Sequence, residues 1–108
     1  MGAALDTLKA QFDLLEDNLP QMLAACSGRK GCLAKVNMQY ARARGNYQDA
    51  LAAAFQENDP QVAAAEKAMQ DEQAKLKAAL EDLTNMSAVI AVITSAIDVG
   101  AGLLGLAG

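Results

Sequence analysis

Apolar residues recur at alternating intervals of three and four positions along the first half of this 108-residue chain. The first series comprises Leu5, Leu8, Phe12, Leu15, Leu19, Met22 and Cys26, and the second comprises Leu33, Val36, Tyr40, Ala43, Tyr47, Ala50 and Ala54. This period places the apolar side chains on one stripe of an α-helix, whereas a half-buried strand would alternate apolar and polar residues. An amphipathic helix has to bury its stripe against other helices. The spacing therefore predicts a helical bundle.

The composition agrees with an all-α fold of one domain. Good helix formers such as Ala, Leu, Gln, Lys and Glu dominate, and the aromatic residues are two Phe and two Tyr. A chain of 108 residues is long enough for a single modest core. We therefore predict one helical-bundle domain over residues 1–108, with a core of many small contacts and no cofactor.

Glycine and proline residues mark the expected ends of the first two helices. Pro20 deletes one backbone hydrogen bond and should kink the first helix, which we place at about 3–26. Ser27 and Gly28 should end that helix, because Gly readily takes a left-handed cap conformation. The second helix is expected over 32–57.

The second half of the chain contains a strong helix-start signal at Asp59-Pro60. The Asp side chain can accept a hydrogen bond from the first free N–H groups, and Pro at the first helical position has no donor to lose. One helix from 60 to 99 would be roughly 60 Å long, so we expect a break near 84–87. The complete prediction is a compact antiparallel bundle of three to four helices, the last two over 60–84 and 87–100, with a Gly-rich C-terminal tail.

The two cysteines of the chain, Cys26 and Cys32, flank the stretch Ser-Gly-Arg-Lys-Gly at the expected corner between the first two helices. Five intervening residues do not give the geometry of a Cys-x-x-Cys dithiol, and a zinc site would need further Cys or His ligands that the sequence lacks. We therefore expect a disulfide that closes the corner, with two free thiols in a reducing compartment as the alternative.

The disulfide favours an exported protein, periplasmic or extracellular, over a cytoplasmic one. The first residues show neither the basic nor the apolar region of a signal peptide, so export would follow removal of a signal or use a signal-free route.

Basic residues are concentrated in the middle of a chain whose formal net charge is −4. Residues 18–48 contain no acid and five bases, which are Arg29, Lys30, Lys35, Arg42 and Arg44. These cations either pair with acidic neighbours in the bundle or form an exposed patch for an anionic partner such as phosphate or an acidic lipid. The overall acidity argues against nucleic-acid binding.

The segment 86–108 is apolar on nearly every side, and Asp98 is its one charged residue. It could be a buried helix of the bundle, a surface for a partner or for self-association, or a membrane-inserting segment. Asp98 near the centre opposes insertion. The residues that distinguish a core from an interface here are Val89, Ile90, Ile93 and Ile97.

The sequence predicts binding rather than catalysis. It contains no histidine, so the usual general base at neutral pH is missing, and the carboxylates follow ordinary surface spacings on helices. We therefore predict a non-enzymatic helical interaction or structural protein that presents helix faces to a protein partner or to itself. The alternative function is a membrane-active protein whose segment 86–108 enters lipid.

Overall fold

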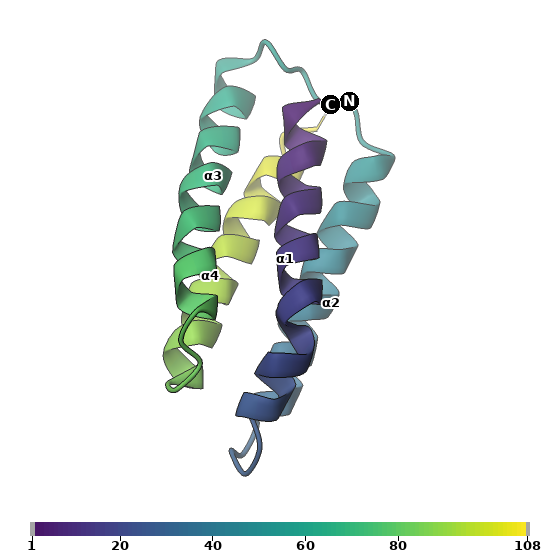
Figure 1. Ribbon diagram of the computed structural model, residues 1–108. Helices are drawn as coiled ribbons and strands as arrows, with labels where there is room; N and C mark the ends of the chain where they lie inside the picture. The colour runs from purple at the N-terminus through teal and green to yellow at the C-terminus, as the bar shows by residue number, and fades with distance from the viewer. Residues whose placement is uncertain (1, 108) are drawn as a thin grey trace.

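The computed structural model describes residues 2–107 and consists of four α-helices joined by short connections (Figure 1). The helices are α1 (Ala3–Ala25), α2 (Cys32–Leu51), α3 (Pro60–Leu80) and α4 (Met86–Leu104). They pack into a bundle of 46 × 22 × 18 Å, and the described residues contain no strand. The predicted all-α bundle is confirmed.

The helices are arranged as two antiparallel hairpins, α1–α2 and α3–α4 (Figure 1). Both α2 and α3 contact α1 and α4, but within residues 2–107 they do not contact each other, so they occupy one diagonal of the bundle. The connection 52–59 therefore crosses the end of the bundle where both termini lie, and the turns within the hairpins are at the opposite end (Figure 1).

The local signals for helix starts act as expected in α3 and α4. The side chain of Asp59 accepts a hydrogen bond from the N–H of Gln61 at 2.8 Å, with Pro60 in the first helical position. The break before α4 is confirmed, and Asn85 caps that helix by accepting from the N–H of Ala88 at 3.2 Å. Pro20 lies inside α1, which continues beyond it without a restart.

Three of the predicted helix boundaries differ from the structure. The second helix ends at Leu51 instead of 57, because Phe55 turns back and packs against the core at the crossover end. The third helix ends at Leu80 instead of 84, since Asp82 and Thr84 form a local turn in which the Thr84 N–H and hydroxyl both donate to Oδ1 of Asp82. The fourth helix extends to Leu104, so much of the segment expected as a Gly-rich tail is helical.

The extension of α4 follows from its packing. Leu103 is fully buried in a cluster with Ala4, Leu8 and Val62 at the crossover end of the core. A side chain at Gly100 would have its Cβ 3.1 Å from Oε1 of Gln11 and 3.2 Å from Cδ2 of Leu8. The glycine thus lets α4 lie directly against α1.

The buried stripes of α1 and α2 agree with the apolar series at most positions, such as Leu8, Leu15, Val36 and Ala43, and differ from it by one residue at others. In α2 the core side chains are Cys32, Val36, Gln39, Ala43 and Ala50, while Leu33 is 49% exposed. Successive helical residues differ by about 100° around the axis, so an inward-facing Cys32 turns Leu33 toward solvent. The expectation that Leu33 lies in the core is wrong.

We predict opposite effects of Gly→Ala changes at two positions of α4. Gly102→Ala meets no atom within 4 Å and should raise the free energy of unfolding by up to about 1 kcal/mol, the gain in helix propensity. Gly100→Ala crowds Leu8 and Gln11 and should leave the protein less stable than Gly102→Ala by about 1 to 3 kcal/mol. Urea denaturation of the two variants measures the difference, and equal midpoints would show that Gly100 is not a tight contact.

Candidate interaction surfaces

The residues singled out in the C-terminal segment lie mainly in the core. Val89, Ile93 and Ile97 are buried, and Ile90 is half-buried at the edge of the same cluster. This cluster includes Val36 of α2 and Leu76 of α3, so the inner side of α4 is covered by both neighbouring helices.

The opposite side of α4 is exposed and is made of small residues. Five exposed residues follow one another at intervals of three and four positions and so share one side of the helix: Ala88, Ala91, Ser95, Asp98 and Gly102. We call this side the α4 outer face. Asp98 is the one charged residue of this face, and Nη2 of Arg42 donates a hydrogen bond to its Oδ1 at 2.6 Å. The Asp98 side chain is 60% exposed, so this ion pair adds little stability.

The helix α4 is strongly apolar, although only part of it is buried. Its 18-residue window with mean hydropathy 1.9 is long enough to cross a membrane, yet 33% of that window is buried inside the molecule. By contrast, the exposed side of α3 includes the charged residues Lys67, Asp71 and Lys77. The α4 outer face is therefore a helix surface of small side chains with a single charge, that of Asp98.

The corner between α1 and α2 is closed by a disulfide. Cys26 and Cys32 are both buried, their Cα atoms are 5.3 Å apart, and the sulfurs are bonded. Gly28 and Gly31 have φ values of 76° and 78°, a left-handed conformation that glycine adopts without a steric penalty. The tight turn thus depends on both glycines and on the bond beneath them.

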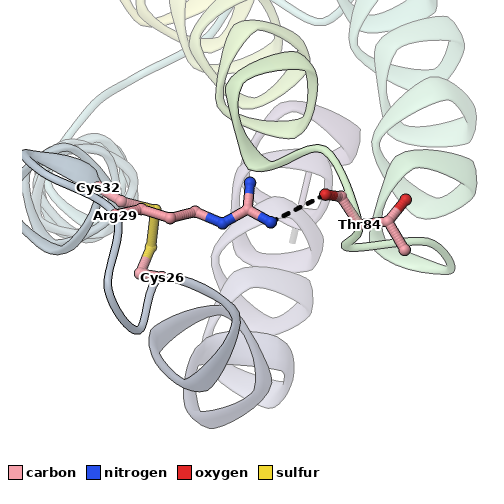
Figure 2. Close-up of a disulfide and its surroundings, with 4 residues drawn as sticks. All are labelled: Cys26, Arg29, Cys32 and Thr84. Atoms are coloured by element: carbon pink, nitrogen blue, oxygen red, sulfur yellow. Dashed lines mark hydrogen bonds between the residues drawn. A yellow bond between two sulfur atoms is a disulfide. The ribbon is translucent and has the colours of Figure 1, made fainter.

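The disulfide turn is connected to the turn of the other hairpin by Arg29. Figure 2 shows its side chain reaching across, where Nη2 donates a hydrogen bond to the carbonyl oxygen of Thr84 at 3.0 Å. The Asp82 carboxylate accepts hydrogen bonds from the hydroxyl and the N–H of Thr84 in its own turn, and these bonds lower its pKa. It forms no ion pair with Arg29.

The five basic residues predicted to form a patch are divided by the structure. Arg42 pairs with Asp98, and Arg44 is two residues away on a different side of α2. The other three, Arg29, Lys30 and Lys35, line one pocket of about 150 Å³ together with Met86 and Ser87 at the start of α4. We call this hollow the basic pocket.

A larger hollow of about 370 Å³ lies between α1 and α3. Two of its polar side chains bind the backbone: the Thr7 hydroxyl donates to the carbonyl of Ala4 at 2.9 Å, and Nε2 of Gln73 donates to that of Ala10 at 3.2 Å. The hollow offers apolar contact without a converging set of charged groups.

Glu66 of α3 is an unexpected buried acid. The sequence analysis places the carboxylates on helix surfaces, and this is wrong for Glu66, which is 8% exposed. Burial raises the pKa of its carboxyl group, as do a hydrogen bond with the carboxyl group of Glu57 and the charge of that group. Its interval of four from Val62 and three from Met69 is the signal that places it on the buried stripe.

Two buried glutamines were also missed by the sequence analysis. Gln11 donates from Nε2 to the carbonyl oxygen of Ala96 at 2.8 Å, and the Oε1 atom of Gln39 accepts from Nη1 of Arg42 at 3.0 Å. The Gln11 amide thus binds the backbone of α4, and the Gln39 amide binds a side chain of its own helix. Both glutamines serve to hold the fold together. Residues 2–107 contain no group of three metal-ligating side chains.

Comparison with known proteins does not assign the chain to a family. It has no significant match among protein-family models, curated proteins or solved structures.

We predict that Glu66→Gln stabilises the protein near neutral pH. A raised pKa means that the folded chain holds the proton more tightly than the unfolded chain, whose Glu has an ordinary value of 4.5. The stability from Glu66 is therefore complete below that value and is lost as the pH rises through the raised pKa. Urea denaturation should show a gain for Glu66→Gln at about pH 7 and little change at about pH 4. The same gain in Asp71→Asn, an exposed control on α3, would contradict this cause.

We predict that the disulfide is a modest local brace. Replacing Cys26 and Cys32 together by Ser should lower the free energy of unfolding by about 2 kcal/mol, since the bond closes a short loop. Helix content should not change, because the bond lies within one hairpin. Thiol labelling of the unfolded wild type should detect no free thiol, and two labelled thiols in protein purified from an oxidising compartment would contradict the prediction.

Proposed function

We propose that this chain is a small, non-enzymatic helical protein, exported to an oxidising compartment, that presents the α4 outer face to a second copy of itself or to another protein. The observation behind the proposal is the contrast between the apolar character of α4 and the limited burial of that helix. An exposed helix surface of small side chains with one charge favours contact with another protein over contact with water alone.

The shape of the α4 outer face supports helix-to-helix contact. Ala88, Ala91, Ser95 and Gly102 have short side chains, which allow a second helix to approach closely. Their alternating intervals of three and four positions match the seam between packed helices. The charge of Asp98 is balanced by Arg42 within the same chain, so it does not repel a partner strongly.

Export and the absence of catalysis are supported by residue chemistry. The bonded pair Cys26–Cys32 is typical of oxidising compartments. The chain has no histidine, and Glu66, the acid with a raised pKa, is buried against Glu57. A buried carboxyl group beside the exposed Glu57 suits a structural contact better than proton transfer to a substrate.

Membrane insertion of α4 is the second candidate function, favoured by the length and hydropathy of that helix. Insertion would have to remove Ile93 and Ile97 from the core and separate Asp98 from Arg42. These contacts make insertion less favourable than docking of the bundle as it stands.

Sedimentation of three proteins tests the proposal. The mass of the wild type should rise with protein concentration. Ala91→Arg should weaken this association at least about tenfold, or about 1.4 kcal/mol, because it places a charge in the contact between the two helices. Ala74→Arg, the same change on the exposed side of α3, is the control and should associate as wild type does. Identical monomer masses for all three would contradict self-association. Flotation of wild type with liposomes would support the membrane candidate instead.

A further inference from the structure

We infer that the basic pocket is a binding site for a phosphate group. The inference does not depend on docking of the α4 outer face, because it concerns the end of the bundle formed by the two hairpin turns. It rests on the charge, size and rigidity of the pocket.

The charge of the pocket is the first argument. Arg29, Lys30 and Lys35 line it and no carboxylate does. The chain has more acids than bases, yet neither lysine forms an ion pair within residues 2–107. Cations gathered in a hollow with no acid produce a positive potential that an anion relieves.

The size of the pocket limits its ligand to a small group. Its volume of about 150 Å³ is small beside the about 300 to 1,000 Å³ of sites for drug-sized ligands. A single phosphate group with ordered water fits, and a whole nucleotide cofactor does not. Guanidinium and ammonium groups are the usual partners of phosphate oxygens.

The pocket lining also includes the start of α4 at Met86 and Ser87. The Asn85 side chain caps the amide of Ala88, and the first amides of a helix have no carbonyl partner inside it. The positive end of the helix dipole adds to the charge of the three cations. This contribution supplements the basic residues and would not define a site without them.

The backbone that carries the three cations is constrained before a ligand arrives. The disulfide closes the turn that contains Arg29 and Lys30, and the Arg29 side chain is anchored to the carbonyl of Thr84 (Figure 2). Lys35 extends from the first turn of α2, which begins at the bonded Cys32. Prior fixing of the binding groups reduces the entropy lost on binding.

A titration with inorganic phosphate tests the site directly. The oxidised full chain is followed by amide NMR at constant ionic strength, with chloride as the reference anion, because general screening affects all exposed cations alike. We expect saturable shifts centred on the turn 27–31 and on Ser87. The double variant Lys30→Gln with Lys35→Gln should bind phosphate about tenfold more weakly. The control is Lys67→Gln with Lys77→Gln, which removes the same charge from the exposed side of α3 and should bind as wild type does.

A second arm identifies the source of the phosphate group. Wild type is mixed with vesicles of phosphatidylcholine alone or with added phosphatidic acid, whose headgroup is a phosphate monoester. Binding to the acidic vesicles that requires Lys30 and Lys35 assigns a lipid headgroup, and phosphate binding without vesicle binding assigns a soluble ligand. The inference is overturned if neither probe binds saturably, or if the Lys67 and Lys77 variant loses binding as much as the pocket variant.

Discussion

The contact of α1 with α4 across the centre of the bundle determines how the two hairpins fit together. At this contact Gly100 lies against Leu8 and Gln11, and Nε2 of Gln11 donates to the carbonyl of Ala96. The missing side chain at Gly100 sets the distance between the helices, while the hydrogen bond sets their relative height, since a shift along the axis would leave the buried amide unpaired. The small residues of α4 thus serve both as a core contact on one side and as an open surface on the other.

The general architecture could be predicted because each of its determinants is local in the sequence. The alternating apolar intervals imply amphipathic helices, Asp59-Pro60 starts α3, and the cysteine spacing suits a closed corner. The helical conformation of Gly100 to Leu104 could not be predicted from the local sequence, because glycines weaken an isolated helix. The packing of Leu103 against α1 and α3 explains why the helix extends this far.

The side chains near the candidate surfaces were harder to predict than the helices. An apolar series identifies a stripe but leaves its rotation uncertain by one residue, and the inward position of Cys32 decides that Leu33 is exposed. The five clustered bases of the sequence looked equivalent, yet an acid far along the chain, Asp98, selects Arg42 as its partner. Glu66 is buried on the inward side of α3, and this burial, together with the nearby carboxyl group of Glu57 in the connection 52–59, raises the pKa of its carboxyl group. Such pairings between distant segments follow from the fold.

The position of the disulfide has a consequence for the mechanics of the molecule. The bond joins α1 to α2 within one hairpin, so within residues 2–107 the two hairpins are linked covalently by the connection 52–59 alone. A force that separates the hairpins is therefore opposed by side-chain packing and by single polar contacts, such as the hydrogen bond between Arg29 and Thr84. The disulfide bond does not oppose it. Separation of the hairpins would leave two covalently intact halves joined at the end of the bundle that contains the connection 52–59 (Figure 1).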